Sequence, residues 1–341
     1  MAQTLTTLRA LLTEAGAAPN RRLGQNFLID LNLLHRVADA GELAPDDRVL
    51  EIGPGTGSLS ETILAALGPA GRLLACEYDQ GLYRITQARI GADPRVRLVH
   101  ADARPRVLAL LSELARPEPI HPPTPPADAL PDSATPTRPT PSGPTNADHR
   151  AAVLKLVANL PYQIAAGVVA ELLLAPIRMG LLAFTVQKEV ALRLVAPPGT
   201  ADYGPLSLVA GLFGQVRILA CLPPQAFWPV PGVESALVQV RPHAAGPLVE
   251  RFGPHWAGLE PAIRHLMGYR RKTLSATIRQ LTRRDDLPLP TWPRILAQAL
   301  EAAGIDPTQR AEQLTLSDWA ELCRHLPPVP RSQQEAKLIH P

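Results

Sequence analysis

The sequence has little cysteine, little net charge and no long apolar run. Its three cysteines, Cys76, Cys221 and Cys323, lie far apart and form no C-x-x-C pair, so we expect neither a disulfide framework nor a metal site. The first residues lack the apolar core of a signal peptide, and no later run is long enough to span a bilayer. We therefore expect a cytoplasmic protein without membrane attachment.

The small net charge hides one strongly basic stretch. The chain carries +3 over 341 residues, so the distribution of charge says more about partners than the sum does. Residues 263–284 contain no acidic side chain and eight basic ones: Arg264, His265, Arg270, Arg271, Lys272, Arg279, Arg283 and Arg284. Because strand signals fade after about residue 241 and helical patterns dominate 259–326, this stretch predicts a basic helix within a small helical domain over 243–341.

Proline is abundant, with 38 residues, and much of it lies in one segment. Residues 117–148 combine Pro with Thr, Ser and Ala and contain few apolar side chains. Such a segment cannot offset its ordering entropy by burial, so we expect a disordered insertion on the surface. A proline-motif ligand for a partner is the functional alternative, and a neutral insertion is the better expectation.

The rest of the chain alternates short apolar runs with helical stretches. After an amphipathic helix over 1–20, this alternation predicts strands at 48–52, 72–76, 96–100, 153–158 and 180–186, with helices at 59–67, 81–90 and 165–174. Alternation of this kind predicts an α/β, doubly wound (Rossmann-like) fold with a mostly parallel sheet.

A glycine-rich turn follows the first of these strands, in VLEIGPGTG (49–57). Gly53, Gly55 and Gly57 remove side chains where the backbone must approach a ligand. Two acids follow the next strands in order: Glu77 can accept hydrogen bonds from ribose hydroxyls, and Asp102 can accept one from an adenine amino group. These three strand ends fit either NAD or S-adenosylmethionine.

The tetrapeptide Asn159-Leu160-Pro161-Tyr162, which follows the fourth strand, favours methyl transfer to an exocyclic amine. The Asn159 side-chain oxygen and the Leu160 carbonyl can accept hydrogen bonds from the amine, which helps its nitrogen become pyramidal. Pro161 fixes the backbone, and Tyr162 offers a face for a flipped base. Read alone, the tetrapeptide is a strand-ending turn, but at this place in this fold we favour the catalytic interpretation.

Seven stretches in a fixed order give the chain a close resemblance to one family. They are RRLGQNFLID (21–30), VLEIGPGTG (49–57), ANLPY (158–162), QKEVALRL (187–194), YGPLS (203–207), FWPVPGVES (227–235) and RRKTL (270–274). Together they resemble the ribosomal RNA adenine N6,N6-dimethyltransferases that modify two adjacent adenines near the 3′ end of small-subunit (16S-type) RNA. The resemblance covers residues 21–326 and leaves out the ends and the proline-rich insertion.

The resemblance implies a cofactor, a partner and a set of site residues. S-adenosylmethionine is bound by Asn26, Leu28, Gly53, Glu77, Asp102 and Asn159. Asn159 and Tyr162 face the target adenine, and Phe227 forms the other wall of its pocket, although Phe227 by itself reads as a core aromatic. The implied partner is RNA in a partly assembled small subunit, and we expect a monomer with a catalytic domain over 21–242.

The basic helix suggests where that RNA is held. We expect Arg270, Arg271 and Lys272 to bind phosphates, which fix register and supply salt-dependent affinity. The alternative is a solvated helix face whose Arg and Lys stems pack against the first domain.

Two departures from the family pattern lie near the expected site. Residues 163–167 read QIAAG where the family usually has NISTP, and Arg104 stands where an apolar residue is usual. Other functions remain as alternatives: a large-subunit RNA adenine methyltransferase of the antibiotic-resistance type, a non-catalytic RNA-binding assembly factor and, more remotely, a dinucleotide oxidoreductase. The last leaves the 159–162 motif and the basic stretch unexplained.

Overall fold

The computed structural model describes residues 4–20, 23–116, 153–284 and 287–328. The proline-rich insertion expected at 117–148 lies outside these residues, as do Arg21 and Arg22 and the last residues of the chain. Within the described part, no helix is both long and apolar enough to cross a membrane.

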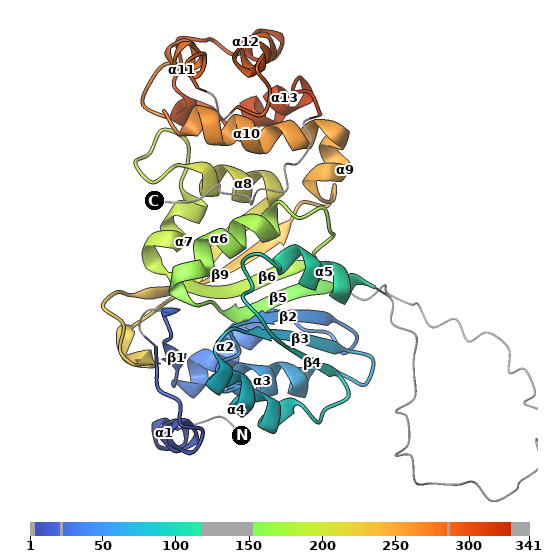
Figure 1. The fold of residues 1–341 in the computed structure, drawn as a ribbon, viewed down its shortest axis with the longest axis vertical. Coiled ribbons are helices and arrows are strands. Elements are labelled where there is room, and N and C mark those ends of the chain that lie inside the picture. Colours follow the sequence, from blue (N-terminus) through green and yellow to red (C-terminus); the bar gives the residue numbers. More distant parts are fainter. Residues whose placement is uncertain (1–3, 21–22, 117–152, 285–286, 329–341) are drawn as a thin grey trace, which may run out of the picture.

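A seven-stranded sheet forms the centre of the molecule, in the order β4-β3-β2-β5-β6-β9-β7 (Figure 1). The first five strands in this order are parallel, whereas β9 runs antiparallel to both β6 and β7. The strands are β2 (Arg48–Ile52), β3 (Arg72–Glu77), β4 (Val96–His100), β5 (Leu154–Asn159), β6 (Leu181–Gln187), β7 (Gly214–Leu222) and β9 (Ser235–Pro242). A separate antiparallel pair joins β1 (Phe27–Leu28) to β8 (Phe227–Trp228).

Helices cover both faces of the sheet, which confirms the doubly wound α/β fold (Figure 1). Helices α2 (Leu31–Ala40) and α3 (Ser58–Ala66) bury apolar side chains against one face, and α4 (Gln80–Ile90) lies beside them. The other face is covered by α5 (Val107–Ala115), α6 (Tyr162–Leu173), α7 (Lys188–Val195) and α8 (Pro205–Phe213). The central strands are buried on both faces, which is why their sequences read as continuous apolar runs.

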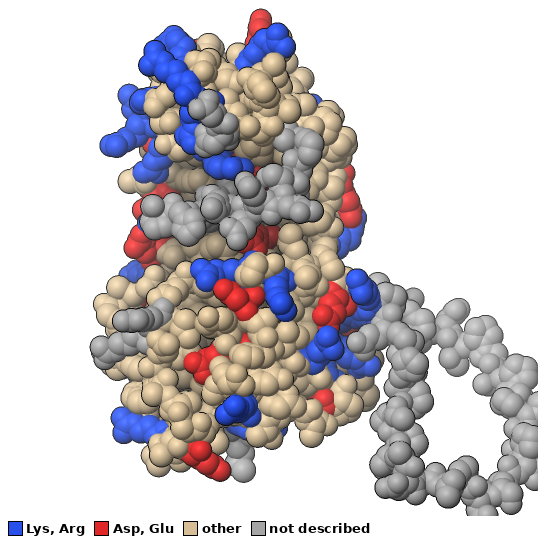
Figure 2. Space-filling view, in the orientation of Figure 1, with Lys and Arg blue, Asp and Glu red and all other residues tan. Residues whose placement is uncertain are grey.

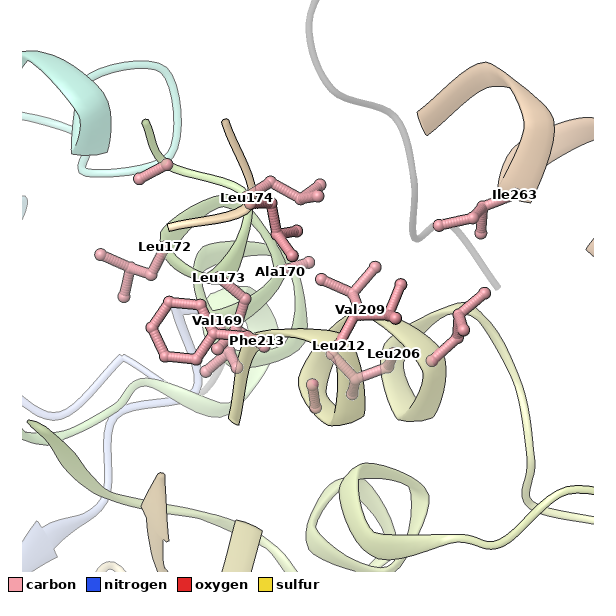
Figure 3. Close-up of a cluster of buried hydrophobic side chains, with 14 of the residues drawn as sticks. Val169, Ala170, Leu172, Leu173, Leu174, Leu206, Val209, Leu212, Phe213 and Ile263 are labelled. Atoms are coloured by element: carbon pink, nitrogen blue, oxygen red, sulfur yellow. The ribbon is translucent and has the colours of Figure 1, made fainter. Parts of the chain in front are cut away.

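The chain after the sheet is helical. It contains α9 (Leu248–Phe252), α10 (Trp256–Met267), α11 (Leu274–Leu281), α12 (Trp292–Ala302) and α13 (Leu316–Arg324), with 3-10 turns at Pro224–Ala226, Gly253–His255 and Ala311–Gln313 elsewhere in the C-terminal half. One apolar cluster runs from the sheet face through α6 and α8 to Ile263 of α10 (Figure 3). The C-terminal helices therefore share a continuous core with the sheet.

The single basic helix expected over 263–284 is wrong. Helix α10 ends at Met267, and a turn through Gly268 separates it from α11. Thr273 caps α11 by accepting a hydrogen bond from the Ala276 amide at 3.2 Å, so the chain restarts a helix there. The amphipathic helix at the N-terminus is also shorter than 1–20: α1 spans Leu5–Glu14 and ends before Gly16, whose φ is +61°.

Candidate active site

A cavity of about 190 Å³ opens at the carboxyl ends of β2, β3 and β5, beside the loop that follows β4. Several separate segments line it, and they include the residues expected to bind the cofactor: Asn26, Leu28, Gly53, Glu77, Asp102 and Asn159. Ligands of doubly wound sheets bind outside the carboxyl ends of the strands. The residues that the sequence placed at successive strand ends are therefore together in space.

The glycine turn is shaped so that side chains cannot enter it. Gly53 and Gly55 have φ values of +69° and +62°, which L-residues rarely adopt. A Cβ at Gly53 would lie 2.9 Å from Cγ of Pro161, and one at Gly55 would lie 3.1 Å from the Phe27 ring. The glycine turn and the Asn159–Tyr162 motif are thus packed directly against each other.

Glu77 ends β3 with its carboxylate turned toward the glycine turn. Its Oε2 accepts a hydrogen bond from the Gly55 amide at 3.1 Å, and its Oε1 accepts one from the Asp79 amide at 2.9 Å. Burial raises the pKa of Glu77 to about 7, against the lowering effect of these hydrogen bonds. The carboxylate is held in a fixed orientation and keeps lone pairs for ligand hydroxyls.

Glu51, which sequence reasoning did not select, is a second buried acid on the cavity wall. Only 1% of its surface is exposed, and its Oε2 accepts a hydrogen bond from the Ser60 hydroxyl at 2.6 Å. Burial raises its pKa to about 8, and the nearby charge of Glu77 adds to the shift. The available signal was an acid in the middle of an otherwise apolar strand, since buried carboxylates are rare without a role.

Asp102 lies just beyond β4 and is held by the residue that departs from the family pattern. Its Oδ1 accepts a hydrogen bond from the Arg104 amide at 3.0 Å, and Arg104 Nη2 lies 3.0 Å from its Oδ2. Partial burial acts to raise the pKa of Asp102, but the hydrogen bonds from Arg104 outweigh it, so the pKa is lowered. Arg104 itself lines the cavity, so this departure from the family pattern lies on the cavity wall beside Asp102.

Asn159 connects the motif to two other segments. Its Nδ2 donates to the Asn26 carbonyl at 3.0 Å, and its Oδ1 accepts a hydrogen bond from the Thr185 hydroxyl. These contacts fix which end of the amide is oxygen. An amide oxygen has two lone pairs, so Oδ1 can accept a further hydrogen bond from a ligand amine.

Tyr162 begins α6, is half-buried and lines the cavity. Its hydroxyl is hydrogen-bonded to Ser235 at the start of β9. Burial raises the pKa of the Tyr162 hydroxyl, partly opposed by the Ser235 hydrogen bond. The phenol therefore stays neutral and its ring is anchored.

Phe227 does not form a wall of the cavity in this structure, contrary to the expectation. Its side chain is fully buried and belongs to the apolar cluster beneath α2 and α3. The cause is the β1–β8 pairing, in which Leu28 lies opposite Phe227. The core-aromatic reading of this residue matches its position.

The three basic residues expected to hold RNA lie away from the cavity and differ from one another. Arg270 donates from Nη1 to the Tyr203 carbonyl at 2.5 Å and lies 3.8 Å from a Glu312 carboxylate oxygen. Lys272 contacts Gln280 and lies 5.3 Å above the Tyr269 ring, and Arg271 is exposed. Lys and Arg side chains gather at the upper left of Figure 2, over the C-terminal helices.

A family model described as ribosomal RNA adenine dimethylase matches residues 16–323. The chain belongs to this family. Among its relatives, the Ribosomal RNA small subunit methyltransferase A of Pelotomaculum thermopropionicum is 32% identical over 315 residues, covering 92% of this chain and 94% of the relative. The protein of the same name from Thermobifida fusca is 34% identical over 330 residues, covering 94% of each chain.

Two solved structures share the fold. A dimethyladenosine transferase from Plasmodium falciparum is 18% identical with a TM-score of 0.57, covering 86% of this chain and 94% of its own. The 23S rRNA methyltransferase ErmE is 22% identical with a TM-score of 0.52, covering 88% and 99%. At these identities the likeness concerns the fold alone.

Membership identifies the protein as an S-adenosylmethionine-dependent ribosomal RNA adenine dimethyltransferase. The cavity itself, apart from the family membership, has features that fit this cofactor. Its glycine turn leaves space that a Cβ would fill, and the buried carboxyl groups of Glu51 and Glu77 suit a ligand with hydroxyl groups. Membership of the family, rather than the shape of the cavity, excludes the oxidoreductase alternative.

Proposed function

We propose that this protein methylates N6 of two adjacent adenines near the 3′ end of small-subunit ribosomal RNA, giving dimethyladenosines during small-subunit assembly. The observation that carries the proposal is the packing of the Asn159–Tyr162 motif against the glycine turn, which is so close that a Cβ added at Gly53 would lie 2.9 Å from Cγ of Pro161. This packing brings groups suited to an adenine amine beside a site suited to the cofactor. The names of the relatives supply the small subunit.

The cofactor site uses contacts that this chain already positions. Glu77, fixed by two backbone amides, accepts hydrogen bonds from the ribose hydroxyls. Asp102, held by Arg104, accepts one from the adenine amino group of the cofactor. Asn26, Leu28 and Gly53 complete the walls. Bound S-adenosylmethionine supplies a methyl group on a sulfonium, which is a good leaving group.

The target adenine is handled by Asn159, Leu160 and Tyr162. The Asn159 oxygen and the Leu160 carbonyl accept hydrogen bonds from the N6–H groups, which concentrates the nitrogen lone pair toward the methyl group. Tyr162, anchored by Ser235, offers a ring face to a base turned out of its helix. The amine proton leaves to solvent after transfer, so orientation and electrostatics provide most of the acceleration.

The RNA partner extends beyond the adenine pocket. We infer that Arg271 and Lys272 bind RNA phosphates. Arg270 contributes charge and also stabilises the turn between α10 and α11 through its hydrogen bond to the Tyr203 carbonyl. Residues 243 onward then form the RNA-binding part, next to a catalytic domain over 21–242. The protein acts as a cytoplasmic monomer on a partly assembled small subunit.

The experiment that tests this proposal also tests two alternatives: a methyltransferase that acts on large-subunit RNA, and a non-catalytic assembly factor. The fold likeness to ErmE is nearly as strong as that to the dimethyladenosine transferase, so the fold does not separate the two RNA substrates. The stretches 187–194, 203–207 and 227–235 favour the small subunit. A non-catalytic assembly factor is disfavoured by the intact Glu77 and Asn159.

Methyl transfer to defined substrates tests the proposal. The purified protein is incubated with labelled S-adenosylmethionine and either unmodified small subunits, small-subunit RNA or large-subunit RNA. We expect label only on small-subunit substrates, at two methyl groups for each of two adenines. Label on large-subunit RNA supports the resistance-type enzyme, and binding without transfer supports the assembly factor.

A further inference from the structure

A second hollow, of about 340 Å³, lies at the opposite end of the sheet from the cofactor cavity. It is bordered by the end of α2, by the loop that follows α2 and by strands β7 and β9. Three arginines from different elements line it: Arg36 on α2, Arg217 on β7 and Arg241 on β9. The remaining polar residues that line it are Asp39, Glu42 and Gln239.

The strand register places these side chains on one face. Arg217 of β7 lies opposite Gln239 of β9, and Arg241 follows Gln239 by two residues, so both β9 side chains point the same way. On this face α2 covers Leu237, and beyond Ala40 the sheet surface becomes polar and open. Arg217 and Arg241 therefore lie on a strand surface next to the end of α2, which carries Arg36.

One wall of the hollow is rigid and strained. Glu42 has a φ of +46°, the one positive value among the described non-glycine residues. Its carboxylate accepts hydrogen bonds from Arg241 and, at 3.2 Å, from Gln239, whose Nε2 also donates to the Ala40 carbonyl at 2.8 Å. A left-handed conformation is strained for a residue with a side chain, and such strain often marks functional positions.

A buried ion pair between Lys155 and Asp47 holds the backbone at Glu42. Lys155 Nζ contacts the Glu42 carbonyl and lies 2.6 Å from an Asp47 carboxylate oxygen, with 10% and 2% of the two side chains exposed. The backbone of Glu42 is therefore held at its carbonyl as well as through its side chain. The result of this network is that the Arg241 guanidinium has a fixed position at the hollow.

The charges leave the hollow positive. Three guanidinium groups face two carboxylates, and Glu42 is already paired with Arg241. Arg36 and Arg217 are exposed, and the ion pairs found among the described residues include neither of them. Guanidinium groups match the geometry of phosphate oxygens and hold them through paired hydrogen bonds.

The hollow is connected to the adenine site by one strand. Ser235, which bonds Tyr162, begins β9, and Arg241 follows six residues later. At about 3.3 Å per residue the two ends are roughly 20 Å apart. A nucleic acid that places one adenine at Tyr162 can extend over this distance along the protein surface.

We propose that Arg36, Arg217 and Arg241 form a phosphate-binding site for the backbone of the ribosomal RNA substrate, remote from the target adenine. This inference rests on the proposed RNA substrate. The site reads no base, so it contributes register and salt-dependent affinity rather than chemistry. Because Asp39 opposes the arginines, the site holds one or two phosphates rather than a long stretch of backbone.

Charge changes of opposite sign test the site without depending on folding. The double variant Arg36→Gln, Arg217→Gln should bind unmodified small subunits about three- to tenfold more weakly. Its salt slope should fall by roughly one unit for each phosphate that the variant no longer neutralises. Asp39→Asn removes an opposing charge from the same hollow and should tighten binding. Arg84→Gln, which removes an exposed charge on α4, should bind like the parent.

The readouts separate this site from the catalytic proposal. All three variants should keep the parent affinity for S-adenosylmethionine, because the cofactor cavity is at the other edge of the sheet. An unchanged affinity and salt slope in the double variant overturns the site, and so does weaker binding by Asp39→Asn. If the parent binds small subunits but transfers no methyl group, the proposed function fails while the binding comparison still decides this one.

Discussion

The proposed cofactor cavity and the C-terminal region hold their candidate functional residues in different ways. In the cavity, the side chains follow consecutive parallel strands and are fixed by hydrogen bonds to the backbone, as Glu77 is by Gly55 and Asp79. In the turn between α10 and α11, the basic residues are neighbours in sequence but have different surroundings: Arg270 is half-buried against Tyr203, and Arg271 is exposed. A motif tied to strand ends predicts position well, whereas a run of charge predicts only composition.

The sharpest way to test this contrast is to remove the motif at its centre. Asn159→Ala should lower kcat by about 100-fold or more, as removal of a preorganised transition-state hydrogen bond does. Steady-state transfer to unmodified small subunits measures it. Thr185→Val, which removes only the hydroxyl that bonds Asn159, is the matched control and should have a smaller effect. Equal activity of Asn159→Ala and the parent removes Asn159 from the chemistry.

A substitution at Glu77 tests whether the cavity binds S-adenosylmethionine and whether cofactor binding is separate from RNA binding. Hydrogen bonds to charged groups contribute roughly 1.5–3 kcal/mol each, so Glu77→Ala should weaken S-adenosylmethionine binding by about tenfold or more. Calorimetry on the purified protein measures this affinity. RNA affinity should not change, because the C-terminal helices are untouched. Parent-like cofactor affinity would take Glu77 out of the site.

Glu51 links the cavity to stability through its raised pKa. The folded state keeps this carboxyl protonated up to a pH of about 8, whereas its usual pKa is 4.5. The folded state then binds more protons than the unfolded state between these values, so stability should fall as pH rises through this range. Glu51→Gln, which stays neutral, should lose part of this fall and gain on the parent by on the order of 1 kcal/mol or more at pH 8.

Denaturant unfolding at pH 5 and pH 8 measures the difference. Glu77, with a pKa of about 7, contributes in the same direction and remains in the variant, so some pH dependence persists. Ser60 can still donate to the glutamine oxygen, so the variant keeps this hydrogen bond and the comparison isolates the charge. Parallel pH profiles for the two proteins would show that Glu51 is ionised when folded.

The smallest effects should come from Arg270, Arg271 and Lys272, in the turn between α10 and α11. We expect Arg270 to affect stability as well as RNA binding, and the other two to affect RNA binding alone. Arg271→Gln with Lys272→Gln should weaken RNA binding a few-fold and leave the melting temperature unchanged. The salt slope should fall by roughly one unit for each phosphate left without its cation. Arg270→Gln should also lower the melting temperature by a few degrees, because it removes the bonds to Tyr203 and Glu312. Salt titrations and thermal melts would contradict this division if all three residues behaved alike.

The parallel half of the fold could be predicted from sequence, and the antiparallel half could not. Strands β2, β3, β5 and β6 are almost fully buried and read as apolar runs, whereas the edge strand β7 has exposed residues such as Arg217 and gives no such signal. The other edge strand, β4, is only partly buried. The order of Gly53, Glu77, Asp102 and Asn159 at strand ends predicted the cavity. Glu51 was missed because its strand looks purely structural, and the position of Phe227 depends on a two-residue pairing with Leu28 that no local pattern reveals.

Mass mapping of small-subunit RNA from cells with and without this protein decides whether it is the small-subunit dimethyltransferase. We expect two adjacent adenines near the 3′ end to carry two methyl groups each when the protein is present and none when it is absent. Restoring the gene should restore both modifications, and restoring it with Asn159→Ala should not. Fully dimethylated adenines in cells that lack the protein would contradict this assignment.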